Sequence, residues 1–116
     1  MKYLILMYAD ESIGSDYSKE EAQAAAKTWA EFRKEIGASG VLISSNGVAP
    51  DTSPTTIRVR EGKTMITDGP FAETHEQLGG YFLVDCKDLD EAIHWAEKIP
   101  TAKYGSIEIR PLWSPG

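Results

Sequence analysis

The sequence predicts an α+β fold in a single domain that spans residues 1–116. The predicted order of elements is strand, helix, strand, hairpin, strand, helix, strand. Each predicted helix begins at a polar capping residue that is followed three positions later by Glu, which is a typical helix start. Two strands are apolar on both faces and two are half polar, so the strands occupy different places in a sheet.

The first strand covers residues 2–8 and is apolar on both faces, so it needs cover on two sides and belongs in the middle of a sheet. Ser18 and Glu21 then form a capping box, and a helix follows to about Ala38. The apolar residues of this helix recur at three- and four-residue spacing, which predicts one buried face made of Ala22, Ala25, Ala26, Trp29, Phe32 and Ile36.

The middle of the chain is predicted to form a half-polar strand and a hairpin. Residues 41–46 mix apolar and polar side chains, which suits an edge strand. Residues 55–60 and 64–67 alternate apolar and polar side chains around a glycine turn, which indicates a hairpin. Arg58 and Arg60 lie on one side of it, either as solvated charges that discourage unwanted pairing or as an anion clamp over the following loop.

The last third repeats the strand–helix–strand pattern. Residues 78–86 form the second strand that is apolar on both faces, and Asp88 caps a helix that Pro100 ends. Residues 106–113 form a half-polar final strand. The second helix is expected to bury four side chains: Leu89, Ala92, Ile93 and Ala96.

These patterns favour a ferredoxin-like βαββαβ sheet with an inserted β-hairpin. Such a sheet places its first and third main strands in the middle, which agrees with their apolarity on both faces. Two helices cover only one face, so the other face of the central strands would be an apolar patch larger than monomers usually expose. We therefore expect a homodimer in which two sheets pack against each other, with a pocket between sheet and connecting loops.

The segment between the hairpin and the third main strand holds most of the candidate chemistry. Gly69 and Pro70 form a stiff turn, which Asp68 can cap and Phe71 can anchor to a core. The turn is either purely structural or aims three side chains at one place: Asp68, Glu73 and His75. Functional side chains often lie on loops that a rigid scaffold holds.

Further candidates lie where strands begin and end near this segment. Tyr8 and Asp10 lie where the first strand leaves the sheet, and Tyr81 follows Gly79 and Gly80 at the start of the third main strand. The two glycines either form a bulge or leave the backbone bare so that a ligand can approach closely.

The motif DGPF at residues 68–71, followed by Glu73-Thr74 and residues 76–81, resembles the motif of the YCII-related (DGPF domain) proteins. Residues 1–8 and 107–113 are also similar to the ends of that family, so the resemblance covers nearly the whole chain. It implies a ferredoxin-like subunit that pairs into a dimeric α/β barrel. Some relatives are thought to be small-molecule lyases or dehydrochlorinases that use a His-Asp pair, and others lie near sigma-factor genes. Those enzymes carry a histidine in or near the first strand, where this chain has none.

Three functional hypotheses follow. In the first, the protein is a small-molecule enzyme of lyase or isomerase type, with His75 as general acid or base because imidazole titrates near neutral pH. Asp68 or Glu73 would orient it, and the other ligand-binding candidates are Tyr8, Asp10, Pro70, Phe71 and Tyr81. In the second, the same pocket belongs to a non-catalytic ligand-binding or regulatory module, such as one linked to sigma-factor regulation.

The third hypothesis is a metal site made of Asp68, Glu73, His75 and Glu76, but these residues lack a known metal-binding spacing. The sequence therefore predicts no metal and no cofactor.

Composition limits the partners. The formal charge is −6 and no basic stripe is present, so nucleic-acid binding is not expected. No apolar run approaches the roughly 18 residues of a membrane helix, and the N-terminal apolar run lacks signal-peptide features. The single cysteine, Cys86, excludes an internal disulfide and lies in an apolar strand, where a buried, inert thiol is expected. A cytoplasmic location fits these features.

Overall fold

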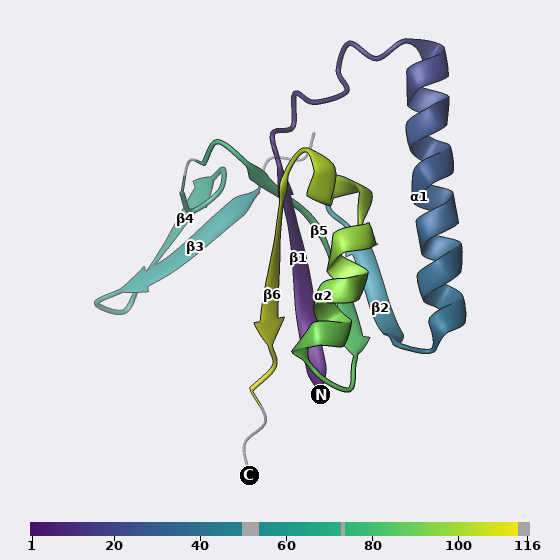
Figure 1. Ribbon diagram of the computed structural model, residues 1–116. Helices are drawn as coiled ribbons and strands as arrows, with labels where there is room; N and C mark the ends of the chain where they lie inside the picture. Colours follow the sequence, from purple (N-terminus) through teal and green to yellow (C-terminus); the bar gives the residue numbers. More distant parts are fainter. Residues whose placement is uncertain (50–53, 73, 114–116) are drawn as a thin grey trace.

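A four-stranded antiparallel sheet forms the body of the protein in the computed structural model, which describes residues 1–49, 54–72 and 74–113 (Figure 1). Its strands lie in the order β2-β5-β1-β6, and their bounds are Lys2–Ala9 for β1, Leu42–Gly47 for β2, Gln77–Asp85 for β5 and Ser106–Pro111 for β6. The predicted α+β class is confirmed, as is the central position of the first and third main strands. The arrangement is compatible with a ferredoxin-like fold.

One face of this sheet carries the hydrophobic core. Side chains that alternate along β1 and β5 are buried in one cluster with residues of helices α1 (Lys19–Ser39) and α2 (Leu89–Lys98), and the short 3₁₀ helix η1 (Pro100–Lys103) follows α2. The buried cluster contains Tyr3, Ile5, Met7, Phe32, Ile36, Phe82, Val84, Cys86, Ala92, Trp95, Ala96 and Ile99. Both helices therefore stabilise the same side of the sheet.

The opposite face of β1 and β5 is also apolar but only half-buried. Leu4 lies opposite Leu83, and Leu6 lies opposite Tyr81, in the antiparallel register. Their side chains alternate with the core residues and so point away from the helices. We call this half-buried surface the open face.

Helix α1 is packed along only half of its length. Its capping box is confirmed, with Ser18 Oγ accepting from the backbone N–H of Glu21 at 3.1 Å and Glu21 Oε1 accepting from the Ser18 N–H at 3.1 Å. Phe32 and Ile36 are buried, whereas Trp29 is half-buried. The prediction of one continuous buried face was wrong for Ala22 and Ala26, which are exposed because the first half of α1 overhangs the sheet.

Helix α2 buries a larger share of its residues than α1. Asp88 caps it as predicted, accepting from the Glu91 N–H at 2.9 Å. Of the four residues expected inside, Ala92 and Ala96 are buried, but the prediction was wrong for Leu89 and Ile93, which are exposed. Trp95 is buried in their place.

The hairpin formed by β3 (Thr55–Arg60) and β4 (Lys63–Asp68) is a separate two-stranded sheet that projects from the body (Figure 1). Glu61 and Gly62 both have positive φ, at 51° and 75°, as a tight hairpin turn requires. One face of the hairpin carries the exposed side chains of Ile57, Val59 and Ile66. No helix of the described residues is long and apolar enough to cross a membrane.

The turn after the hairpin is tied to it through the backbone. Thr56 Oγ1 donates to the carbonyl of Gly69 at 2.7 Å, and Arg58 donates to the carbonyl of Phe71 at 3.3 Å. Phe71 itself is 78 % exposed, so the expectation that it anchors the turn to a core was wrong for this chain. Hydrogen bonds to the hairpin hold the turn instead.

Candidate functional site

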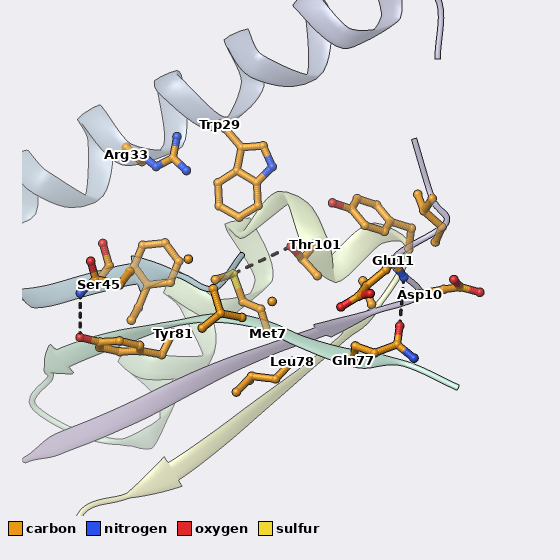
Figure 2. A pocket seen from close by; sticks show the side chains of 18 residues that line it. Met7, Asp10, Glu11, Trp29, Arg33, Ser45, Gln77, Leu78, Tyr81 and Thr101 are labelled. Atoms are coloured by element: carbon orange, nitrogen blue, oxygen red, sulfur yellow. Dashed lines mark hydrogen bonds between the residues drawn. The ribbon is translucent and has the colours of Figure 1, made fainter. Parts of the chain in front are cut away.

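A cleft lies between the middle of α1, at Trp29 and Arg33, and the sheet, and we call it the helix-side cleft (Figure 2). Its volume is about 520 Å³, which falls within the usual range for small-molecule sites. Met7 and Phe82 contribute from the core face of the sheet, while Leu78 and Tyr81 of β5 complete the wall. The cleft therefore lies where α1 passes from its exposed first half to its buried second half.

The cleft has oppositely charged ends. Arg33 of α1 lies at one end, with its guanidinium carbon 5.1 Å from the centre of the Trp29 ring. Asp10 and Glu11, which follow β1, lie at the other end, and Figure 2 shows Trp29 and Met7 between the two. A ligand in this cleft therefore meets a cation, an apolar middle and two carboxylates in turn.

Asp10 is fixed by local hydrogen bonds. Its Oδ1 accepts from the Ser12 backbone N–H at 2.9 Å and from the Ser12 hydroxyl at 2.7 Å. These bonds, the backbone one first, lower the pKa of the Asp10 carboxyl, so it is a carboxylate at neutral pH. Next to it, the Glu11 N–H donates to Gln77 Oε1 at 3.1 Å, which ties this loop to β5.

A second, shallower depression of about 510 Å³ lies beside the end of β1. It is lined by Tyr8, Thr74, His75, Glu76, Ser106 and Glu108. The Tyr8 hydroxyl donates to Glu108 Oε1 at 3.3 Å, and the Ser106 hydroxyl donates to Glu76 Oε1 at 2.7 Å. Partial burial, followed by the nearby Glu108 carboxylate, raises the pKa of Tyr8, so its hydroxyl stays protonated.

His75 connects this depression to Asp10. Its Nε2 lies 3.8 Å from Asp10 Oδ2, while the imidazole itself is 90 % exposed. Asp10 lines the helix-side cleft and His75 lines the second depression, so this contact joins a residue of each hollow. The structure thus brings together Tyr8, Asp10 and His75 at one end of the sheet.

The other predicted site residues lie apart from this group. Tyr81 lines the helix-side cleft, and its hydroxyl accepts from Asn46 Nδ2 at 3.0 Å, a bond that lowers the Tyr81 pKa. Asp68 lies exposed at the end of β4, opposite Thr55, and Pro70 and Phe71 follow it in the exposed turn. Glu73 lies outside the described residues.

Within residues 1–49, 54–72 and 74–113, no three or more His, Cys, Asp or Glu side chains are grouped so that they could hold a metal ion. The proposed ligands Asp68, His75 and Glu76 are among these residues. The geometry therefore gives no support to the metal hypothesis in this part of the chain.

Only Asp10 and Tyr81 of the residues that line the helix-side cleft were predicted as site residues, and Trp29 and Arg33 are the most important of those that were not. Trp29 was assigned to the core because it shares the apolar stripe of α1, and Arg33 was not considered. The available signal was the spacing of four, which places Arg33 one turn after Trp29 on the same side of the helix. Such a pair marks a site only when the helix stands away from the sheet, which spacing alone does not predict.

Comparison with known proteins gives the family. The family model for the YCII-related domain matches residues 1–114. An uncharacterised protein from Rhizobium meliloti (strain 1021) is 40 % identical over 120 residues, covering 100 % of this chain and 97 % of that protein. This chain is a small α+β protein that belongs to the YCII-related family. The resemblance seen in the DGPF motif and in the chain ends is thereby confirmed.

Proposed function

We propose that this protein is a homodimeric small-molecule enzyme of lyase or isomerase type, in which His75 moves a substrate proton. The observation that carries the proposal is the approach of His75 Nε2 to Asp10 Oδ2, at 3.8 Å, beside a depression lined by hydroxyl and carboxylate groups. Such contacts are often longer in ligand-free sites than in substrate complexes.

The contact with Asp10 supports different roles for the two imidazole nitrogens of His75. Because Nε2 faces the carboxylate, Nδ1 remains available to take a proton from carbon next to a substrate carbonyl. Asp10, held as a carboxylate by Ser12, would then stabilise the imidazolium that forms. The protonated hydroxyl of Tyr8 is suited to hydrogen-bond the substrate oxygen as negative charge develops on it.

A second copy of the chain would complete the site. The open face presents Leu4, Leu6, Tyr8, Tyr81 and Leu83, which a monomer would leave half-exposed. Tyr8 belongs both to this face and to the depression that His75 lines. Sheet-to-sheet pairing would therefore cover the depression and exclude water from it. Two-fold pairing of identical surfaces is the commonest way in which such a face is covered.

Exchange of carbon-bound hydrogen with solvent deuterium tests the catalytic role without a known substrate. A panel of small ketones, aldehydes and esters would be incubated with the protein in D₂O and followed by proton NMR. We expect at least one compound to exchange, and His75→Gln to slow that exchange by about 100-fold. The matched control is His94→Gln, which changes an exposed histidine of α2. Equal rates in wild type and His75→Gln would contradict the proposal.

Sedimentation equilibrium tests the dimer. Leu6→Asp and Leu83→Asp, each of which places a charge on the open face twice per dimer, should shift the molecular mass from two chains toward one. Leu89→Asp is the control because Leu89 is exposed at the first position of α2, on the helix side, where an acidic residue is favourable. A wild-type protein that stays monomeric at micromolar concentration would contradict the proposal that a second chain covers the depression.

The alternative is a non-catalytic ligand-binding or regulatory module. The observation that favours it is the 90 % exposure of the His75 side chain, which leaves the imidazole largely in water. In this case the deuterium panel would show no exchange above a heat-denatured control. A ligand would still protect the protein in thermal unfolding, because binding to the folded state alone raises its stability.

A further inference from the structure

We propose that the helix-side cleft binds a small aromatic carboxylate, whose carboxylate pairs with Arg33 while its ring lies along Trp29. The cleft lies on the helix side of the sheet and shares only Tyr81 with the five residues named for the open face, and Arg33 and Trp29 have no part in the proton transfer proposed for His75. The inference therefore goes beyond the proposed function and can fail or succeed separately from it.

Arg33 is the group that selects the charge of the ligand. Among the described residues, its guanidinium makes no ion pair and donates no hydrogen bond, and its close neighbour is the Trp29 ring at 5.1 Å. A guanidinium presents five N–H donors in a plane that matches a carboxylate. The Ser45 hydroxyl of β2 lines the same cleft and can add a donor.

The middle of the cleft selects an apolar ring. Trp29 is held at a fixed angle, because its ring meets Phe32 edge-to-face at 84° with the ring centres 6.3 Å apart. Met7 and Phe82 form the opposite wall, and the Met7 sulfur accepts from the Thr101 hydroxyl at 3.9 Å. An aromatic ring between these walls would gain both burial and ring-to-ring contact.

The acidic end limits the ligand to one negative group. Asp10 already accepts two bonds from Ser12 at Oδ1 and faces His75 at Oδ2, so a cationic ligand finds a carboxylate that is largely satisfied. A second anionic group at this end would be repelled by Asp10 and by Glu11. Among the described residues, the Glu11 carboxylate also makes no ion pair and accepts no hydrogen bond, but Arg33 is the charge that lies against the Trp29 ring. The ligand that the ring and the guanidinium together favour is therefore a monocarboxylate.

Three probes with the same ring separate charge from shape: phenylacetate, 2-phenylethanol and phenethylamine. Binding to the full-length protein would be followed by NMR titration, with the indole N–H signal of Trp29, assigned through Trp29→Phe, as the local reporter. We expect phenylacetate to shift this signal and to bind at least tenfold tighter than the alcohol or the amine. The dianion 1,4-phenylenediacetate should bind more weakly than phenylacetate.

Substitution of Arg33 locates the effect. Arg33→Gln should weaken phenylacetate binding at least tenfold and leave the alcohol unchanged, whereas Arg33→Lys should restore part of the affinity. Arg60→Gln is the matched control, since it removes the same charge from the exposed hairpin. Phenylacetate binding that is undetectable at millimolar concentration, that equals amine binding, or that survives Arg33→Gln within twofold would overturn the proposal.

Discussion

The two helices of this protein are similarly capped but differently packed. Helix α1 has 21 residues and buries two of them, whereas α2 has 10 residues and buries three. The chain after α2 remains inside, with Ile99, Pro100 and Thr101 all buried. The short helix therefore closes the core, while the long helix leaves a space beneath its middle, at Trp29 and Arg33.

The difference comes from where each helix is held. Glu35, near the end of α1, pairs with Lys98 of α2, and Phe32 packs edge-to-face on Phe82 with ring centres 5.5 Å apart. In the first half of α1 the apolar side chains are all alanines, which bury little area. A helix fixed at one end by large side chains is a simple way to build a cleft.

The largest expected effect is that of Phe32→Ala. Removing this buried ring should lower the free energy of unfolding by about 3–5 kcal/mol, measured by urea denaturation. Trp29→Ala should cost less than half as much, because Trp29 is half-buried at the cleft. Equal costs would mean that Trp29 belongs to the core and that the cleft is closed in solution.

The next largest effect is a difference in stability when an alanine of each helix is enlarged to leucine. Ala92→Leu should destabilise the protein by about 1–3 kcal/mol, since Ala92 has no exposed surface and the core around it is filled. Ala22→Leu, in the exposed half of α1, should change stability by less than about 0.5 kcal/mol. Thermal unfolding of both variants checks this, and the comparison fails if the two melting temperatures fall equally.

A smaller effect is expected from the caps. Ser18→Ala and Asp88→Ala each remove one capping bond, at a cost of about 1 kcal/mol. Hydrogen exchange should show faster exchange confined to the first turns of α1 in Ser18→Ala, because that half packs against little. In Asp88→Ala, exchange should rise throughout the core that α2 closes. Identical exchange patterns would argue against separate packing of the helices.

The last prediction needs no substitution: chemical labelling of Cys86 tests directly whether α2 keeps the core closed. Burial, followed by the nearby Glu91 carboxylate, raises the pKa of this thiol to about 11. Because the thiolate is the reactive form, the folded protein should react far more slowly with Ellman's reagent at pH 8 than the urea-unfolded chain. The rate should climb as pH approaches the raised pKa, and rapid labelling at pH 8 would show that α2 opens readily.

Local signals predicted much of the fold, because strand apolarity and capping residues act over a few neighbours. The predicted capping bonds of Ser18 and Asp88 and the central place of β1 and β5 are confirmed. The burial of Trp95 in place of Leu89 was missed, since it depends on how α2 is rotated on the sheet.

The site was harder to predict. Sequence proximity suggested Asp68 or Glu73 as the partner of His75. Among the residues that the structure describes, which do not include Glu73, the carboxylate beside His75 is Asp10, which follows β1 near the other end of the chain. The exposure of Phe71 was missed for a related reason, because hydrogen bonds to the hairpin, rather than apolar burial, hold that turn. Contacts that depend on tertiary structure leave no trace in local patterns.

The projecting β3–β4 hairpin has a practical consequence for anyone who measures the size of this protein. The radius of gyration is 16.6 Å, whereas a compact chain of this length would have about 13 Å. The principal extents of 48, 48 and 19 Å describe a broad, thin particle rather than a sphere. A single chain would therefore leave a gel-filtration column early, at the volume of a heavier globular standard. Its stoichiometry has to come from light scattering or another shape-independent mass.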